Sequence, residues 1–221
     1  MNWTPLILSL ELAVITTCCL LIIGIPIAAK LAESKSRYKF LIEAVVSLPL
    51  VLPPTVLGFY LLIVFSRNHA IGNFFYETFG VQLAFSFEGL VVASVLYSLP
   101  FMVQPIQAGL QNLPISLTEA AYTMGKGKRT VLWKVLLPNI KPALLTGVVL
   151  SFAHTIGEFG IVLMIGGKIP GETLVASIAV YDEVESLNYA QANFYSGILL
   201  MISFVILAIT YFINRVFYTS S

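Results

Sequence analysis

Ionisable side chains are scarce in the apolar stretches of this 221-residue sequence, and two of them stand one helical turn apart. His154 and Glu158 could pass a proton or hold an ion if their segment is a helix. A proton relay or a coupled-ion site inside a membrane is usually built from paired carboxylates or a longer His/Asp chain, and the sequence shows neither. The pair therefore has two interpretations: a role in the passage of a solute, or a hydrogen-bonded contact between helices.

A second candidate is a polar stretch in the middle of the chain, where Ser116 and Glu119 have the spacing of a capping box. The box predicts a short helix that ends at Gly125, a residue that can adopt the left-handed conformation. A second helix is predicted over Thr130–Leu137, closed by Pro138. The first helix is suited either to docking in a groove of a partner protein or to lying on a membrane surface. Its apolar stripe is expected to comprise Leu113, Leu117, Ala120, Ala121 and Met124.

No segment has the pattern of an ATP-binding loop, in which glycines precede a Gly-Lys-Ser/Thr sequence. Gly166–Ile169 lacks the hydroxyl residue, and Lys126–Thr130 lacks a glycine at the required spacing before it. The two cysteines, Cys18 and Cys19, are adjacent and make neither a disulfide framework nor a metal site. We expect no catalytic residue, no metal site and no cofactor bound by this chain, so energy from ATP would have to come from another polypeptide.

The elements that position these residues follow from the composition. Hydrophobic residues make up 58% of the chain and charged residues only 10%, with a mean hydropathy of +0.91, whereas soluble domains carry about 25% charged residues. The chain 1–221 is therefore expected to be a single all-α domain integral to a membrane. Five stretches are apolar and long enough to cross a bilayer core about 30 Å thick as helices: 6–29, 40–65, 86–108, 142–164 and 193–213.

The orientation of the spans is predicted by the positions of the basic residues. Of the 12 Lys and Arg residues, all but two fall in the loops 30–39 and 109–141 or at Arg215. The positive-inside rule makes these loops cytoplasmic, which places the amino terminus outside and the carboxyl terminus inside. The last outer loop is acidic, and a short helix at the outer surface is predicted there over Thr173–Glu185.

The second span is irregular where a solute path is expected. Pro49, Pro53 and Pro54 lie near its middle, and each proline removes an amide donor from the helix. At membrane depth, freed backbone groups are tolerated where they are buried or face a wet cavity. A packing kink explains any single proline, but the cluster favours a pathway wall or hinge.

The long cytoplasmic loop resembles the EAA signature of ATP-binding-cassette (ABC) import permeases. The signature reads Glu-Ala-Ala, three residues, Gly, nine residues and Ile-x-Leu-Pro, and the chain matches it throughout except for Val135 in place of Ile. The resemblance implies a type I importer fold, in which this loop forms a coupling helix seated in a cleft of a separate ATPase subunit. The candidate coupling residues are Ser116, Leu117, Glu119, Ala120, Ala121, Met124, Gly125, Leu137 and Pro138.

Four further blocks resemble the molybdate permeases within that family: Leu48–Leu61, Ala84–Ser86, Gly157–Gly160 and Ile169–Thr173. Related sulfate and thiosulfate permeases share the last two blocks and tend to be longer, so the LPLVLPP run of the first block favours molybdate. His154 stands where many relatives have Arg, and a histidine would supply less charge near neutral pH. Sulfate, thiosulfate and tungstate remain alternatives.

The resemblance implies a permease for a tetrahedral dianion, which needs a wet, gated path because desolvating one charge costs on the order of tens of kcal/mol. The expected assembly lies in the bacterial cytoplasmic membrane, among its lipids. It contains two copies of this chain, two ATPase subunits that bind ATP and Mg²⁺ and an extracytoplasmic oxyanion-binding protein, with no nucleic acid. An ion-coupled secondary transporter or channel, or a non-transporting scaffold, are the alternatives of other classes. Candidate path or gate residues are Pro49, Pro53, Pro54, His154, Gly157, Glu158, Phe159 and Gly160.

Overall fold

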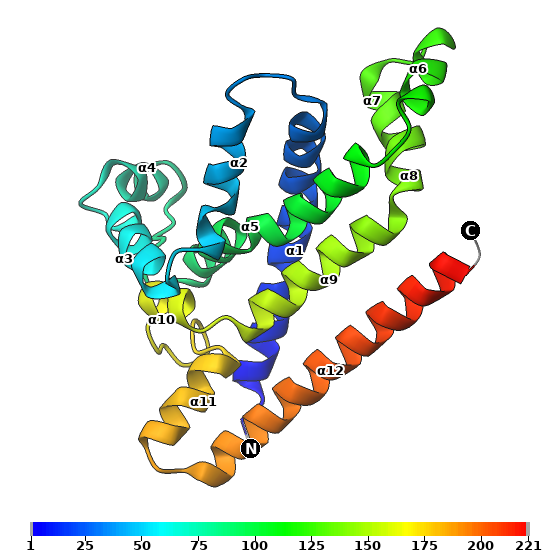
Figure 1. Cartoon of the computed structure of the whole chain (residues 1–221). Helices are drawn as coiled ribbons and strands as arrows, with labels where there is room; N and C mark the ends of the chain where they lie inside the picture. Colours follow the sequence, from blue (N-terminus) through cyan, green and yellow to red (C-terminus); the bar gives the residue numbers. More distant parts are fainter. Residues whose placement is uncertain (1, 220–221) are drawn as a thin grey trace.

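The computed structural model of the chain describes residues 2–219, with side chains described as far as residue 212. Within that range the chain forms helices joined by loops, with no β-strand. Figure 1 shows the helices α6 and α7 at the same end of the molecule as the loop between α1 and α2. The amino terminus and helix α11 lie at the opposite end.

Three helices form the centre of the fold: α1 (Thr4–Glu33), α5 (Phe87–Gln111) and α9 (Lys141–Gly157). Their close approach depends on small residues around the fully buried Met102 of α5. A Cβ added at Gly24 of α1 would lie 2.8 Å from Met102 Cγ, and one added at Gly147 of α9 would lie 3.2 Å from the Met102 carbonyl oxygen. Glycines at these positions let the neighbouring backbones approach, as is common between helices in membranes.

Three helices are individually long and apolar enough to cross a membrane: α1, α5 and the part of α12 (Tyr189–Thr219) up to Phe212. Two bent helix pairs raise the number to five if each pair is one span. The first pair replaces the predicted span 40–65. Its two arms, Lys39–Leu50 and Pro54–Phe65, meet at an angle of 106°.

The prediction of one continuous span over 142–164 is wrong. Helix α9 ends at Gly157, and a separate helix, α10 (Gly160–Gly166), follows. Between them the backbone of Glu158 is extended, with φ −67° and ψ 131°. Two glycines flank this point, and glycine costs about 1 kcal/mol relative to alanine in a helix. The second bent pair is instead Lys128–Asn139 with α9, at 84°.

Two short helices lie away from α6: α4 (Ala70–Phe79) beside the arm Pro54–Phe65, and α11 (Ala176–Glu185) at the end that holds the amino terminus. Helix α11 begins later than the predicted Thr173, because the Thr173 hydroxyl donates to the Gly166 carbonyl at 2.6 Å and holds a turn there. It is also more than a surface helix, since Ile178 is fully buried and α11 packs against α1 and α12.

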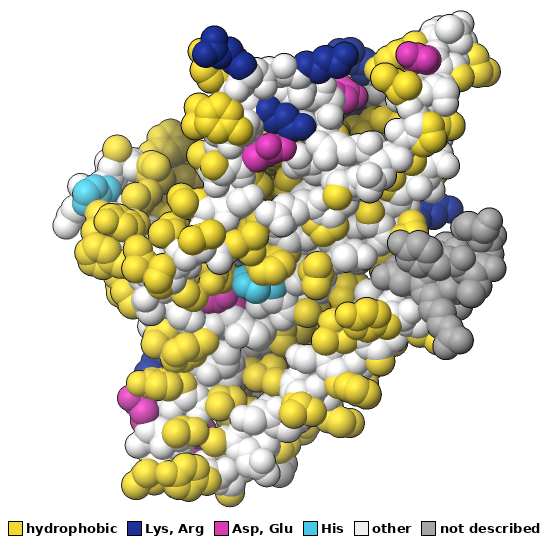
Figure 2. Space-filling view, in the orientation of Figure 1, with side chains coloured by type: hydrophobic (Ala, Val, Ile, Leu, Met, Phe, Trp, Pro, Cys, Tyr) yellow, Lys and Arg dark blue, Asp and Glu magenta, His cyan; other side chains and the backbone are white. Residues whose placement is uncertain are grey.

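Hydrophobic side chains cover much of the face drawn in Figure 2, and Lys and Arg side chains gather at the end that carries the α1–α2 loop. Helix α12 packs on α9 and α11 with one side only. Its other side exposes large apolar residues, as expected for contact with lipid: Leu200, Met201, Phe204, Val205, Leu207, Ile209, Tyr211 and Phe212.

Candidate functional site

The EAA-like segment forms a hairpin of short helices, here called the coupling hairpin (Ile115–Asn139). It comprises α6 (Ile115–Thr123), α7 (Lys128–Val131), a π-helix (Leu132–Leu136) and α8 (Leu137–Asn139). Ser116 and Glu119 lie in α6, as predicted, but the capping box is not formed. Pro114 is the N-cap, and no side chain caps the helix. Because α6 begins at Ile115, Ser116 is already inside the helix and cannot take the N-cap conformation.

The predicted end of the first helix is confirmed. Gly125 has φ +72°, in the left-handed region. The Gly125 amide donates to the Tyr122 carbonyl at 2.9 Å, and the Lys126 amide donates to the Ala121 carbonyl at 3.1 Å. These two bonds form a Schellman motif, which satisfies carbonyls that would otherwise lack partners at the helix end.

The second arm of the hairpin differs from its prediction, because the helical path does not stop at Pro138. Pro138 lies inside α8, after the π-helix. The π-helix widens the turn, so that the Leu137 amide donates to the Leu132 carbonyl five residues back. The Asn139 side-chain amide donates to the Val135 carbonyl at 2.7 Å. Through these bonds the chain accommodates a proline that has no N–H to contribute.

The predicted apolar stripe of the first helix is divided between two sides. Ala121 is buried in a small core with Val131 and Leu136, and Leu113 packs against this core. Ala120 and Met124 are exposed, as are Ser116 and Glu119. The hairpin therefore uses one side of α6 to hold itself together and leaves the other free. Leu137 belongs to a different core, which includes Ile106 and Ile140.

The proline cluster and the Gly157–Gly160 block, more than a hundred residues apart in sequence, come together in space. Pro53 is the N-cap of α3 (Pro54–Phe65), and a short 3₁₀ helix that contains Pro49 precedes it. A Cβ added at Gly160 would lie 2.7 Å from the Pro54 Cβ. One added at Gly58 would lie 2.8 Å from the Met164 Cβ. This set, Pro54, Gly58, Gly160 and Met164, is called the proline–glycine contact below.

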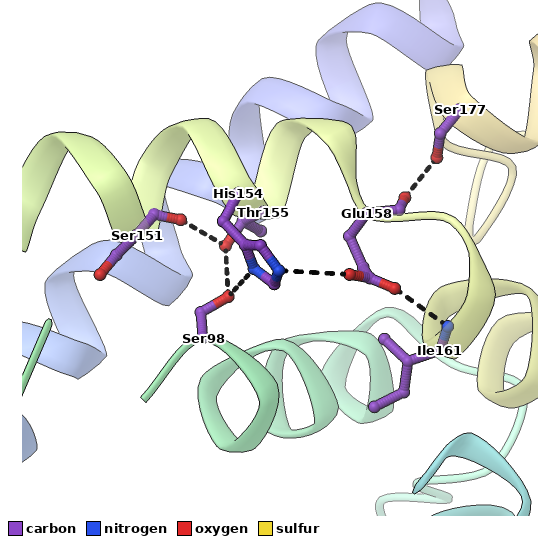
Figure 3. A network of polar contacts seen from close by, with 7 residues as sticks. All are labelled: Ser98, Ser151, His154, Thr155, Glu158, Ile161 and Ser177. Atoms are coloured by element: carbon purple, nitrogen blue, oxygen red, sulfur yellow. Dashed lines mark hydrogen bonds and ion pairs between the residues drawn. The ribbon is translucent and has the colours of Figure 1, made fainter. Parts of the chain in front are cut away.

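A polar network surrounds the break between α9 and α10 (Figure 3). His154 Nδ1 lies 2.9 Å from the Ser98 hydroxyl, which also lies 3.1 Å from the Thr155 hydroxyl. His154 Nε2 is 3.8 Å from Glu158 Oε2. The imidazole ring stacks on Phe101, with 4.2 Å between ring centroids. The sequence pairs His154 with Glu158, but it gives no sign of Ser98 because that residue comes from another helix.

Glu158 holds the break itself. Its side chain is buried, with 7% of the residue exposed, and Oε1 accepts a hydrogen bond from the Ile161 amide at 3.1 Å. Its backbone carbonyl accepts from the Ser177 hydroxyl of α11 at 2.5 Å. The carboxylate thus supplies a partner for an amide at the start of α10, where helix N–H groups have no intrahelical acceptor. Of the two interpretations of the His154–Glu158 pair, these hydrogen bonds directly support a contact between helices.

An ionic cluster between Lys168, which follows α10, and helix α11 adjoins the same break. Lys168 Nζ lies 2.7 Å from Asp182 Oδ1 and 2.8 Å from Glu185 Oε2. The Tyr181 hydroxyl donates to Glu185 at 2.7 Å, and the Tyr181 ring lies 5.1 Å from that of Phe159. Hydrogen bonds from Lys168 and Tyr181 lower the pKa of Glu185, while those to Asp182 and Glu185 raise the pKa of Lys168.

The protein family of the chain follows from a match along most of its length. The model of the binding-protein-dependent transport system inner membrane component matches residues 21–219. The chain belongs to this family. As an inner-membrane transport component it is not itself the ATPase. Among the described residues no group of three or more His, Cys, Asp or Glu side chains could hold a metal ion.

The chain is similar to known permease proteins along most of its length. The molybdenum transport system permease protein ModB of Azotobacter vinelandii is 47% identical over 208 residues, which is 94% of this chain and 92% of the relative. The protein of the same name from Escherichia coli K12 is 36% identical over 84% of this chain and 81% of its own length. The sulfate transport system permease protein CysT of Synechocystis is also 36% identical, but the match covers only 65% of its length.

Solved structures show that the inner-membrane component has the fold of ABC importer permeases. A chain of the MetNI methionine ABC transporter, crystallised in inward-facing conformations, superposes with a TM-score of 0.72 at 18% identity and covers 96% of this chain. A chain of a bacterial alginate ABC importer gives a TM-score of 0.71 at 17% identity and covers 95%. These likenesses confirm the predicted type I importer fold.

Proposed function

We propose that the chain is the permease subunit of an ATP-driven importer that translocates molybdate across the bacterial cytoplasmic membrane. The observation that carries this proposal is the 47% identity to ModB of Azotobacter vinelandii over nearly the whole of both chains. The sulfate permease of Synechocystis is less similar and extends well beyond the matched region. Sulfate, thiosulfate and tungstate are therefore secondary candidates.

The proposed topology has five spans, with the bent pairs counted as one span each, an outer amino terminus and an inner carboxyl terminus. It is supported by the basic residues of the loops 30–39 and 109–141, because both loops lie at the same end of the molecule (Figure 1). The acidic residues of the Lys168 cluster then face outward. Arg215 is one of the basic residues predicted to be cytoplasmic, but its side chain lies outside the described residues.

The coupling hairpin is the proposed contact with the ATPase. Two copies of the permease chain would each dock the exposed side of α6 into one ATPase subunit, which binds ATP and Mg²⁺. This side carries Ser116, Glu119, Ala120 and Met124. Leu117 is half-buried, and the burial of Ala121 gives it a supporting role within the hairpin.

The proline–glycine contact and the Glu158 break form the proposed outer gate. Closure of the ATPases on ATP would move the two coupling hairpins together and open the path toward a loaded oxyanion-binding protein, and hydrolysis would reset it inward. Two broken helices that meet where glycines and a proline ring pack closely can shift as separate arms, since hinges absorb change at element ends. Gly157 and Phe159 belong to the hinge, and His154 lines the break from α9.

The decisive experiment is uptake by cells that lack their own permease for the oxyanion and carry this chain with its ATPase and binding protein. Labelled molybdate should enter, and unlabelled molybdate should compete far better than sulfate or thiosulfate. Preferential competition by sulfate would move the assignment to the sulfate permeases. Tungstate has the same charge and shape as molybdate, so its competition is measured separately.

The rival class is an ion-coupled carrier or channel, which would need no second polypeptide. Liposomes that contain only this chain should therefore show no oxyanion flux under a proton or sodium gradient. Flux should appear only when the ATPase, ATP and the loaded binding protein are added. Gradient-driven flux through the chain alone would overturn the importer assignment.

A further inference from the structure

A polar pocket opens between α2 (Lys39–Ser47) and α5, toward the end of the molecule that carries the coupling hairpin. It has a volume of about 230 Å³. Two hydrogen bonds cross it, from Gln107 Nε2 to Glu43 Oε1 at 2.5 Å and from Gln104 Nε2 to the Ser47 hydroxyl at 3.0 Å. Both link α2 to α5 across about sixty residues of sequence, and none of the four side chains is fully buried.

The pocket reaches to membrane depth. Gln104 stands seven residues before the end of α5 at Gln111, which corresponds to about 10 Å along the helix axis. One turn further along α5 comes Phe101, whose ring stacks on His154, and then Ser98, which contacts the same imidazole. Helix α5 thus carries polar side chains both beside the break at Glu158 and in the pocket against α2. Polar groups at such depth are costly in lipid and face the bundle interior or a water-filled path.

The chemistry of the pocket is that of a weak anion site. The amide groups of Gln104 and Gln107 and the hydroxyl of Ser47 are neutral hydrogen-bond donors. The one carboxylate, Glu43, already accepts from Gln107, and Lys39 lies 3.6 Å from the same oxygen. Glu43 therefore occupies the Gln107 donor that an oxyanion would use, and its charge repels a dianion that approaches it.

We propose that this pocket is the cytoplasmic half of the oxyanion path, where Ser47, Gln104 and Gln107 hydrogen-bond the passing dianion and Glu43 keeps its stay short. The inference rests on the proposed function, since it takes the solute to be a tetrahedral oxyanion. A conduit must bind well enough to admit the ion and weakly enough to release it. The neutral donors allow the ion to bind, and the carboxylate of Glu43 promotes its release.

The first test uses thiol accessibility in the complete transporter in lipid nanodiscs. With Cys18 and Cys19 replaced by alanine, Gln104→Cys should react with a small anionic methanethiosulfonate in the nucleotide-free complex. Trapping with ATP and vanadate should slow that reaction about tenfold or more, because the inner path then closes. Met201→Cys, on the exposed apolar side of α12, is the lipid-facing control and should react in neither state.

A Gln104→Cys variant that stays unreactive like Met201→Cys would overturn the proposal. So would equal reaction rates in the two nucleotide states, because a path must change its access with the transport cycle. Ser47→Cys repeats the measurement from the α2 side of the pocket, so the result does not depend on one variant.

The second test asks whether Glu43 limits anion binding. Molybdate should protect Gln104→Cys from the reagent, and adding Glu43→Gln should lower the concentration needed for half protection about tenfold, since a repelling charge is lost while the side-chain shape is kept. Glu33→Gln is the matched control, an exposed carboxyl near the same end that does not line this pocket. Equal protection in the Glu43 and Glu33 variants would overturn the role of Glu43.

The choice of anion separates this inference from the proposed function. If accessibility changes with nucleotide but sulfate protects better than molybdate, the path assignment stands and the molybdate assignment fails. If molybdate uptake is normal but no oxyanion protects either cysteine variant, the proposed function stands and this pocket is not the path.

Discussion

The coupling hairpin and the proline–glycine contact lie toward opposite ends of the molecule and are held together in different ways. The hairpin has a small core of Ala121, Val131 and Leu136, and it leaves Ile115 and Met124 71% and 74% exposed. At the proline–glycine contact the neighbouring residues of α10 are fully buried, and backbones approach so closely that two glycines have no room for a Cβ. One region exposes large apolar side chains, whereas the other is closed by contacts within the chain.

This difference predicts where mutations should act. On the hairpin, changes of exposed residues should alter binding to the ATPase and spare the fold of the permease. At the proline–glycine contact, adding a single methyl group should alter stability or gating even though no partner protein touches it.

The largest effect is expected for Ala120→Asp on the exposed side of α6. A carboxylate buried without a partner in a protein interface costs about 3–5 kcal/mol, so co-purification with the ATPase and uptake should fall more than about 100-fold. Glu119→Lys should act in the same direction. Asn193→Asp, an exposed change on α12, should leave both unaffected. Normal ATPase association by both hairpin variants would refute the coupling role of α6.

The next effect is expected at Gly160. Gly160→Ala forces a methyl group to within 2.7 Å of the Pro54 ring, so the two arms must move apart. Overpacking of this kind costs about 1–3 kcal/mol, and the permease should unfold at a lower temperature in detergent and transport more slowly. Gly197→Ala on α12 is the control, because nothing lies within 4 Å of a Cβ there. If the two variants are equally stable and active, the close contact between Gly160 and Pro54 affects neither stability nor transport.

A smaller effect is expected for Gly125→Ala. Its left-handed backbone, with φ +72°, disfavours a residue with a Cβ by about 1 kcal/mol, although a Cβ would meet no neighbour within 4 Å. The end of α6 should fray, and affinity for the ATPase should fall about fivefold in a titration of purified subunits. Gly127→Ala, where φ is −73° and space is also open, should bind as the unmodified chain does. A loss of the same size at Gly127 would point to a general need for flexibility in this turn.

The sequence predicts where helix α6 of the hairpin begins and ends better than it predicts which of its side chains are buried. The positions of α6 and Gly125 depend on local signals, a proline before the helix and a glycine after it, and both are found in the structure. The direction of Ala121 depends on Val131 and Leu136 from the second arm, and a stripe on an isolated helix cannot reveal that packing. The capping box failed for a local reason: Pro114 is the N-cap, so the helix starts two residues too early for Ser116 to cap it.

The outer region depends even more on distant contacts. The prolines of the second span predict an irregularity, and the chain bends there. The apolar length of 142–164 instead predicts one continuous span, which the break after Gly157 contradicts. The meeting of these two regions at Pro54 and Gly160 spans more than a hundred residues, so no local pattern predicts it. The partners of His154 and Lys168 come from other helices for the same reason. Spans are predicted from apolar length, but the break at Glu158 requires knowing that its carboxylate caps α10.

The smallest effect is expected from the exposed Lys168 cluster and should appear as a pH dependence. Hydrogen bonds from Lys168 and Tyr181 lower the pKa of Glu185, so this carboxylate stabilises the folded outer loops above its ordinary pKa of about 4.3. The stabilisation by the Glu185 carboxylate is lost as the pH falls through its lowered pKa. Between about pH 6 and about pH 3, the unfolding temperature of the unmodified chain should therefore fall about 1 °C further than that of Glu185→Gln, which has no proton to gain. Glu172→Gln, an exposed carboxyl outside the cluster, should follow the unmodified chain. Parallel pH curves for all three proteins would mean that the Lys168 cluster does not stabilise the fold, which leaves the tilted contact between the Tyr181 and Phe159 rings to hold α11 against the break.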